Sequence, residues 1–343
     1  MAKKVYVGMS GGVDSSVTAA LLKEQGYAVT GVYMKNWSQD LPGMVCPWKE
    51  DFQDAKRVAV QLGIDFKMYD FETEYRHKVV DYMVREYQAG RTPNPDVMCN
   101  QEVKFKLFLE TALADGADLI ATGHYARVKD SQLFVGLDKG KDQSYFLYRV
   151  TEAALRKSLM PIGEFKKTVV RALAKKLGLA TAEKKDSQGI CFVGKVGIKE
   201  FLLNELSPQP AGPIIDQKGQ EIGRHDGAIF YTIGQRHGLD VGGGLPYYVT
   251  RKDMKTNAVY VTTDLDDKNL WAKELKLENL HWINEKPDEK KQYLARLRYR
   301  GPLVSCQLKG KKLILEEEQR GIAAGQSAVL YDADRVLGGA IIS

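Results

Sequence analysis

Glycines and hydroxyl side chains gather in the segment 8–16, Gly-Met-Ser-Gly-Gly-Val-Asp-Ser-Ser, after a β-branched run and before an apolar-periodic one. Gly11 and Gly12 lack a Cβ, so the backbone there can adopt a positive φ and approach a ligand closely. Backbone N–H groups at the start of the following helix favour an anion. We therefore predict a phosphate site made by Gly8, Met9, Ser10, Gly11, Gly12, Val13, Asp14 and Ser15.

Two better-known phosphate motifs are absent from this turn. It holds no lysine for a Walker loop, and it does not match GxGxxG. A plain strand-to-helix turn capped by Asp14 or Ser15 is the alternative. The run Ser-Gly-Gly-Val-Asp-Ser instead resembles the PP-loop of the ATP pyrophosphatases. That resemblance implies ATP with Mg²⁺, cleaved between its α and β phosphates.

Cys99 is the first candidate nucleophile. The prolines of Thr92-Pro93-Asn94-Pro95-Asp96 disfavour helix, which predicts a loop that ends where Cys99 opens an amphipathic helix. A thiol at a helix start, with Lys104 and Lys106 following, is expected to be stabilised as a thiolate. Asp96 could accept a proton beside it. A buried structural cysteine is the alternative.

The other three cysteines differ in their surroundings. Cys191 lies in Gly-Ile-Cys-Phe-Val-Gly, where the flanking glycines indicate a loop able to move this thiol toward another sulfur. Cys46 and Cys306 stand in no motif and are interpreted as structural. The wide spacing of the four cysteines predicts neither a disulfide framework nor a zinc site.

Further polar residues follow predicted strands or alternate along them. Gly123 and His124 end a strand and could meet nucleotide, while Met34, at the end of another, could pack on adenine or in the core. Lys141, Asp142 and Gln143 precede aromatic residues, a pattern that suits phosphate contact and base stacking. Arg296, Arg298 and Arg300 alternate with apolar residues, which predicts one strand with a basic stripe.

The elements that position these residues alternate between strand and helix in the first part of the chain. This pattern predicts an α/β domain over 1–203, with a parallel sheet covered by helices and the ligand at the carboxyl ends of its strands. A Pro- and Gly-rich linker near 207–213 separates it from short alternating runs. We expect a small central β domain over 204–270 and a β-barrel over 271–343.

Composition narrows the class of protein. The chain has 343 residues, enough for two or three domains, and a formal net charge of +6, which is compatible with nucleic acid. It has no apolar run long enough for a membrane span and no signal-peptide pattern. A cytoplasmic enzyme with reduced thiols is expected.

Five motifs occur in one order: Ser-Gly-Gly-Val-Asp-Ser, Asn-Pro-Asp-Val-Met-Cys-Asn, Thr-Gly-His-Tyr-Ala, Lys-Asp-Gln-Ser-Tyr-Phe and Gly-Ile-Cys-Phe-Val-Gly. Together they resemble the bacterial tRNA-specific 2-thiouridylases (the MnmA/TrmU family), within the PP-loop superfamily of the adenine nucleotide alpha hydrolase-like fold. The likeness extends through Tyr231-Thr232-Ile233-Gly234-Gln235-Arg236-His237-Gly238 to Arg298-Tyr299-Arg300, so it spans nearly the whole chain.

The resemblance implies adenylation of the C2 oxygen in the wobble uridine of tRNAs for Lys, Glu and Gln, then replacement of that oxygen by sulfur. It makes Cys191 the persulfide carrier and Cys99 the nucleophile, joined in a transient disulfide, with Asp96 as acid/base. A cysteine desulfurase or sulfur-relay protein supplies the sulfur. ATP binds the PP-loop with Met34 and Gly123, the target base faces Asn94, Pro95 and Asp96, and tRNA contacts Lys141, Asp142, Gln143, Tyr299 and Arg300.

Three alternatives stay open on the residues alone. A PP-loop amide-forming ligase would bind ATP in the same way, but it would need neither Cys99 nor Cys191. A nucleotide-gated RNA-binding protein would need no paired cysteines. An iron–sulfur cluster held by Asp96, Cys99 and Cys191 could stand in place of a persulfide.

Overall fold

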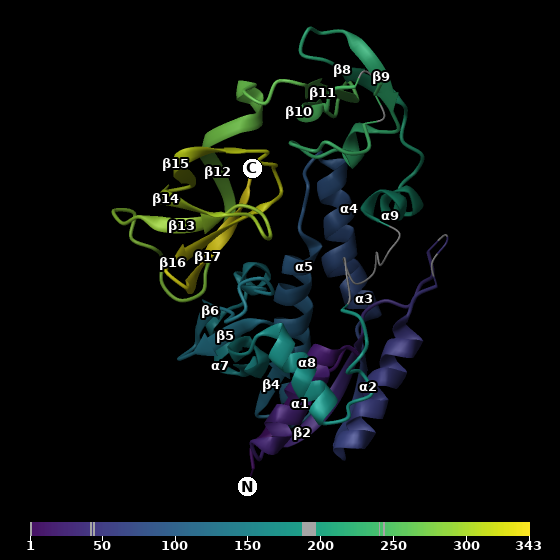
Figure 1. Cartoon of the computed structure of the whole chain (residues 1–343), viewed down its shortest axis with the longest axis vertical. Helices are drawn as coiled ribbons and strands as arrows, with labels where there is room; N and C mark the ends of the chain where they lie inside the picture. Colours follow the sequence, from purple (N-terminus) through teal and green to yellow (C-terminus); the bar gives the residue numbers. More distant parts are fainter. Residues whose placement is uncertain (1, 42, 44, 187–196, 240, 243) are drawn as a thin grey trace.

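The computed structural model describes residues 2–41, 43, 45–186, 197–239, 241–242 and 244–343. Figure 1 shows a parallel-sheet domain near the N-terminus, a small β domain at the far end of the molecule, and a barrel that carries the C-terminus. A helical run over residues 72–88, whose last part is α4 (Asp81–Gln88), extends from the parallel-sheet domain toward the small β domain. No helix in the described ranges is long and apolar enough to cross a bilayer.

The first domain is built on a five-stranded sheet in the order β3-β2-β1-β4-β7, with every neighbouring pair parallel. The predicted parallel sheet is therefore confirmed. Because β2 and β4 flank β1 on opposite sides, the loop after β1 lies where the strand order reverses, the place at which such sheets bind ligands. The strands are β1 (Lys4–Gly8), β2 (Ala28–Lys35), β3 (Asp65–Asp70), β4 (Leu119–Thr122) and β7 (Ser158–Leu159).

Helices cover both faces of this sheet. Val5 and Val7 of β1 pack with α1, α2 and α8, whereas Tyr6 faces the opposite side, where Phe108 lies. This alternation is what a strand buried on both faces requires. The helices are α1 (Val13–Glu24), α2 (Trp48–Leu62), α3 (Glu72–Tyr75), α4 (Asp81–Gln88), α5 (Pro95–Met98), α6 (Phe108–Ala114), α7 (Glu152–Arg156) and α8 (Lys167–Lys176), with π-helical segments Arg76–Val80 and Cys99–Leu107.

The central domain follows α9 (Ile198–Glu205). Its four-stranded sheet has the order β10-β11-β8-β9, made of β8 (Gly212–Ile215), β9 (Glu221–His225), β10 (Tyr248–Asp253) and β11 (Ala258–Thr262). Its small core is centred on Ile214, Val249 and Val259, which are fully buried.

The C-terminal strands close into a barrel. The order β12-β15-β14-β13-β16-β17 returns from β17 to β12, and the hairpin β6-β5 of the first domain extends the same sheet from β17. That extension was not expected from the sequence. The strands are β5 (Ala126–Lys129), β6 (Gln132–Val135), β12 (Trp271–Trp282), β13 (Tyr293–Arg296), β14 (Leu303–Lys309), β15 (Lys312–Arg320), β16 (Ser327–Asp332) and β17 (Arg335–Ile342).

The predicted basic stripe is wrong. Strand β13 ends at Arg296, so Arg298 and Arg300 lie in the turn that follows, where Arg300 has a φ of 60°. Arg296 does not face solvent either, because its guanidinium forms an ion pair with the buried Asp142 at 3.0 Å. The alternation of arginine with apolar residues therefore does not mark one strand face here.

Candidate active site

The PP-loop segment lies at the reversal point of the parallel sheet. Gly11 has a φ of 73°, and a Cβ on it would lie 2.3 Å from the Asp51 carbonyl oxygen. Gly123 also leaves no room for a side chain, because a Cβ on it would lie 2.8 Å from the Ser15 backbone nitrogen of α1. Both glycines are therefore required by close backbone approach, and any contact of Gly123 with nucleotide remains a prediction.

Capping by Asp14 or Ser15, the alternative for this turn, is not what the structure shows. Helix α1 begins at Val13 with Gly12 as its N-cap, and no side chain caps it. Ser15 Oγ accepts from the Ser10 backbone N–H at 3.2 Å and donates to the Gly12 carbonyl at 3.1 Å. The loop is thus held by its own hydroxyl, and the first-turn N–H groups have no side-chain cap, as an anion site requires.

Asp14 is the anchor of a charged network beside the loop. It accepts a hydrogen bond from the Tyr125 hydroxyl at 2.8 Å and forms an ion pair with Lys167 Nζ at 2.7 Å. Lys167 is only 9 % exposed and also contacts Asp186 at 2.8 Å. The PP-loop has no lysine of its own, and α8 supplies one from 153 residues away.

Asp186 collects cations from three positions. Besides Lys167, it pairs with Lys141 at 2.8 Å and with Arg171. Burial acts to raise the pKa of Asp186, but hydrogen bonds from Lys141 and Lys167 hold that pKa well below its ordinary value. Lys184, two residues earlier, pairs with Asp51 and Asp54 of α2 at 2.7 and 2.6 Å. The chain leading to residue 186 is therefore fixed to both sides of the PP-loop.

The segment before Cys99 already forms the start of a helix. The prediction that the loop continues up to Cys99 is therefore wrong. Helix α5 begins at Pro95, and the Asn94 side chain caps it by accepting from the N–H groups of Asp96 and Val97 at 3.2 and 3.4 Å. Proline suits this first position because its missing N–H would be unpaired anyway. Asn-Pro-Asp was thus a readable helix start, with cap, proline and acidic residue in order.

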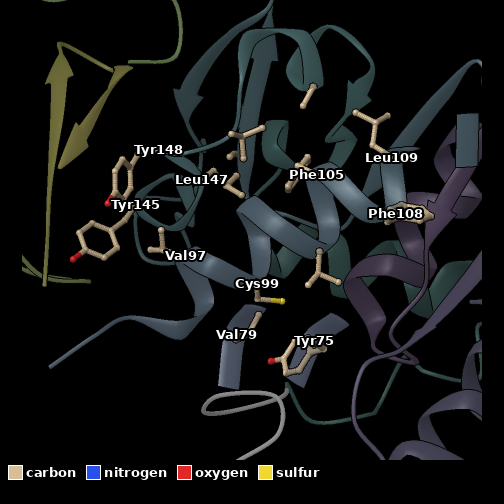
Figure 2. Packing of buried hydrophobic residues seen from close by; sticks show 14 of the residues in the cluster. Tyr75, Val79, Val97, Cys99, Phe105, Phe108, Leu109, Tyr145, Leu147 and Tyr148 are labelled. Carbon is tan, nitrogen blue, oxygen red and sulfur yellow. The ribbon is translucent and has the colours of Figure 1, made fainter. Parts of the chain in front are cut away.

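Cys99 lies one turn inside this helical run, not at its start. Its backbone N–H is already bonded to the carbonyls of Pro95 and Asp96, and the residue is 6 % exposed. Figure 2 shows it packed beside Val79 and Tyr75 within the hydrophobic cluster.

The predicted thiolate is also wrong for this state of the protein. Burial raises the pKa of the Cys99 thiol, outweighing the opposing effects of Lys104 and of a hydrogen bond with Tyr75. Lys106 is engaged elsewhere, with Glu102 at 3.3 Å. Burial likewise raises the pKa of Asp96, again against Lys104. Acid and thiol, three residues apart on one helical face, are thus both biased toward their protonated forms.

We expect Cys99 to react with iodoacetamide more slowly than free cysteine at pH 7, because only the thiolate attacks and a raised pKa lowers its fraction. The rate should climb as pH passes above the ordinary thiol range of about 8.5. Peptide mapping by mass spectrometry over pH 6–10, with Cys99→Ser to identify the peptide, measures it. A rate at pH 7 above that of free cysteine would contradict the buried thiol.

The three residues 141–143 are held within the protein. Asp142 is 3 % exposed and accepts from Gly136 N–H, Ser144 N–H and Ser144 Oγ, as well as from Arg296 of β13. Gln143 Oε1 accepts from the Tyr125 N–H at 3.0 Å, and Lys141 pairs with Asp186. This run connects the PP-loop network to the barrel, and its contacts with tRNA remain a prediction.

Asp142→Asn and Arg296→Met should each destabilise the protein, by about 3–5 kcal/mol, because each leaves a buried charge unpaired. The double variant should recover part of this loss, since no lone charge remains. Urea unfolding monitored by circular dichroism measures all three. If Asp142→Asn unfolds like the wild type and yet binds tRNA poorly, its main role is at the RNA surface instead.

Tyr299 and Arg300 lie where the barrel meets the first domain. The Tyr299 ring packs on Phe146 with centroids 4.3 Å apart, and the Arg300 guanidinium lies 5.2 Å from the Tyr299 ring centre. Arg300 is exposed. An exposed guanidinium over an aromatic ring is a suitable platform for a base or phosphate.

Two nucleotide candidates lie close to the core. Met34 is half-buried, and its Cε lies 2.9 Å from where a Cβ of Gly8 would be. It lines the PP-loop and packs on the core, so both interpretations stay open. His124 is buried, and its Nδ1 lies 2.8 Å from Thr122 Oγ1. Burial lowers the pKa of His124 well below its ordinary value, which favours the neutral imidazole.

Cys191 and its glycine-flanked segment lie outside the described residues, so their predicted motion and pairing stay predictions. Within the ranges that the structure does describe, no three His, Cys, Asp or Glu side chains form a metal-binding group. A cluster that included Cys191 falls beyond that search. Cys46 is half-buried, and burial raises the pKa of Cys306 to about 12.

The whole chain is similar to known proteins. It matches three consecutive family descriptions, a tRNA methyl transferase HUP domain over residues 3–195, a tRNA methyl transferase PRC-barrel domain over 199–263, and an aminomethyltransferase β-barrel domain over 272–342. It is 47 % identical over 350 residues to the tRNA-specific 2-thiouridylase MnmA 2 of Geobacillus kaustophilus, covering 99 % of this chain and 94 % of that protein.

The chain belongs to the tRNA-specific 2-thiouridylase family. Another family member, the 2-thiouridylase MnmA of Streptococcus sanguinis, is 47 % identical over 354 residues, covering 99 % of this chain and 95 % of its own. Among solved structures, a 4-thiouridine synthetase in complex with RNA and ATP matches with a TM-score of 0.39 and 19 % identity, covering 55 % of this chain and 44 % of that one.

Proposed function

We propose that this chain is an ATP-dependent tRNA uridine 2-sulfurtransferase acting on the wobble uridine of tRNAs for Lys, Glu and Gln. The observation that carries the proposal is one helical run. Cys99 and Asp96 lie near its start, and Phe108, nine residues beyond Cys99, packs against Gly8 of the PP-loop. One continuous helical run therefore joins the thiol to the nucleotide end of the site.

The proposed reaction begins at the PP-loop. Uridine O2 attacks the α-phosphorus of ATP, and pyrophosphate leaves with the electrons of the broken P–O bond. The N–H groups of the first turn of α1 and the hydroxyl of Ser10 would hold the phosphates. Asp14, next to Lys167 and partly exposed, fits a Mg²⁺ bound with ATP because carboxylate oxygen is the ligand that this cation prefers.

Sulfur transfer then needs both cysteines. The terminal sulfur of a Cys191 persulfide adds to C2, and AMP departs with O2. Cys99 attacks the Cys191 sulfur, so that the transferred sulfur keeps the S–S electron pair and stays on C2, while a Cys99–Cys191 disulfide forms and is later reduced by a thiol. In a second order of events, Cys99 attacks first and releases hydrosulfide, which then adds to C2. Asp96, once ionised, would accept the Cys99 proton in either order, and its raised pKa makes it a stronger base than an exposed carboxylate.

Burial of Cys99 in the free protein fits this sequence of events. A thiol that is protonated until substrate arrives does not consume the persulfide before the uridine is activated. The target base must leave the anticodon stack, at a cost of a few kcal/mol. Its entry beside Asp96 would bring the base, the acid and the thiol onto one helical face.

The matching family descriptions name methyl transfer, whereas the relatives described above are named 2-thiouridylases. A PP-loop and a buried cysteine with a neighbouring carboxyl suit adenylation and sulfur transfer. A ligase of the same superfamily would have no use for the cysteines, and an RNA-binding protein would have no use for cleavage of ATP.

The test is to follow α-labelled ATP with a tRNA transcript for Lys, a persulfide donor and the purified chain. We expect tRNA-dependent AMP and pyrophosphate, together with thiouridine detected by retarded migration in a mercury-containing gel. A transcript with cytidine at the wobble position is the matched control and should yield none of these three products. Formation of ADP and phosphate, or methylated tRNA without thiouridine, would contradict the proposal.

A further inference from the structure

A cavity of about 380 Å³ lies between the central domain and the barrel, away from the PP-loop and Cys99. It is bounded by the turn 232–235 and by residues of the barrel segments 297–304 and 319–326, and we refer to it as the junction pocket. Its volume is within the range of about 300–1,000 Å³ that small-ligand sites have. The turn is part of the motif Tyr-Thr-Ile-Gly-Gln-Arg-His-Gly, to which the reaction above gives no role.

The walls of the junction pocket combine an apolar floor with cationic edges. Leu297, Val304 and Ile322 supply aliphatic side chains, of which Leu297 is buried and the other two are partly exposed. Arg298 and Arg320 are exposed and line the same cavity. Within the described ranges neither forms an ion pair with a carboxylate, in contrast to Arg296, which is used internally. An apolar slot with two available guanidinium groups suits a flat, anionic ligand.

The pocket is attached to the segment that leads into the proposed base site. Gln326, a lining residue, donates to the Thr92 carbonyl at 2.7 Å, and the Thr92 N–H donates to the Ala324 carbonyl at 2.8 Å. The Thr92 hydroxyl lies 3.0 Å from that of Thr232, in the central-domain turn. Thr92 is only two residues before Asn94, so the pocket adjoins the segment that is proposed to face the target base.

We infer that the junction pocket holds a second, unstacked nucleobase of the tRNA, with its phosphate at Arg298 and Arg320. The inference rests on the proposed function, since it takes the target uridine to lie at Asp96. Unpaired RNA bases are commonly recognised by apolar and guanidinium surfaces, on which they stack once splayed out of the loop. Arg320 is already oriented by the Tyr248 ring, 5.3 Å from its guanidinium carbon, so it has less conformational freedom to lose on binding.

The experiment is a double-variant cycle that combines changes in the RNA with a change in the protein. An anticodon stem-loop RNA is made with an abasic site at each loop position in turn, and each RNA is titrated against wild type and Val304→Trp. Val304 lies on β14 opposite Ala295, and tryptophan suits a strand while filling the cavity. One abasic position outside the target uridine should weaken wild-type binding on the order of tenfold, and should change little in Val304→Trp.

Charge variants are the second part of the experiment. They test the inference even if Val304→Trp does not fold. Arg298→Gln with Arg320→Gln should lower the dependence of log affinity on log salt by about one, because the single phosphate held by both guanidinium groups is no longer neutralised. Lys311→Gln is the matched control. It is exposed in the turn at the opposite end of the β14–β15 hairpin, roughly 20 Å from the pocket at about 3.3 Å per residue, and should leave the slope unchanged.

Three results would overturn the inference. The first is that no loop position couples to Val304→Trp, with the charge variants keeping the wild-type slope. The second is that free uridine or adenosine monophosphate saturates the pocket and leaves RNA binding intact, which marks a small-molecule site. The third is that the variants bind RNA normally but fail to bind a protein partner. In each case the wild-type enzyme still makes thiouridine, so failure of the proposed function, which removes that product, is distinguishable.

Discussion

Cys191→Ser is expected to take up no extra sulfur from a persulfide donor, whereas Cys99→Ser is expected to load one sulfur and retain it. In the proposed reaction, Cys191 carries the sulfur and Cys99 releases it to the product. Both variants should lose thiouridine formation by at least about 10³-fold, as nucleophile removal does in other enzymes. Adenylation should survive in both, because the PP-loop lies at the other end of the helical run.

Intact-mass spectrometry after incubation with the donor, with and without ATP and tRNA, separates the two steps. Cys46→Ser is the matched control, since this half-buried thiol lies in the same domain and should affect neither step. If Cys191→Ser still gains the mass of one sulfur while Cys99→Ser does not, the roles are reversed. If protein alkylated at both cysteines still makes thiouridine, the persulfide mechanism is wrong.

Lys167→Met is expected to weaken ATP binding at least about tenfold and to lower the free energy of unfolding, by an amount toward the lower end of the roughly 3–5 kcal/mol seen for broken buried pairs. Lys167 holds Asp14 of the PP-loop at 2.7 Å and Asp186 at 2.8 Å, and its removal leaves both carboxylates without this cation. The effect on ATP is expected to act through the position of Asp14.

Isothermal titration with ATP and urea unfolding measure the two effects. Lys166→Met is the matched control, because the neighbouring lysine is exposed and should change neither quantity. Lys167→Arg should restore part of the ATP affinity. Wild-type ATP affinity in Lys167→Met would show that this network supports the fold alone.

The pH dependence provides a further measurement on the same variant. Because the folded-state pKa of Asp186 is lowered, its contribution to stability is present above the ordinary carboxyl pKa of about 3.9 and is lost as pH falls below it. Lys167→Met removes one cause of that lowering. The stability difference between wild type and variant should therefore persist at pH 5 and shrink as the pH falls below about 4, when each is measured by thermal unfolding.

The sequence was most informative where a local pattern carries the physics. Glycines between a strand and a helix predict the PP-loop, and the alternation of strands and helices predicts the parallel sheet that puts this loop at a reversal point. Asn94 and Pro95 form a helix-start signal, an N-cap followed by proline. The prediction took the two prolines of this segment as evidence for a loop instead. The cue was present, and position-specific use of proline would have found it.

Lys167 and Arg296 could not be placed in this way, because their partners are distant in the chain. Asp14 is 153 residues from Lys167, and Asp142 is 154 from Arg296. Nothing near either residue distinguishes it from the exposed lysines and arginines around it. The prediction that Cys99 is a thiolate failed for a related reason. Its neighbours in sequence favour a thiolate, but Tyr75 and Val79, which pack over it, determine its burial.

The β5–β6 hairpin of the first domain, which extends the barrel sheet, has a consequence for the synthesis and folding of the protein. Strand β6 pairs with β17, so residues 133–134 meet residues 335–336. A ribosome delivers the first domain long before that partner, and this edge of β6 stays open until β17 has emerged. A chain that stops short of β17 leaves this edge unpaired as well as an unclosed barrel, and such edges recruit other chains. The solubility of the N-terminal half therefore depends on synthesis of the chain through β17.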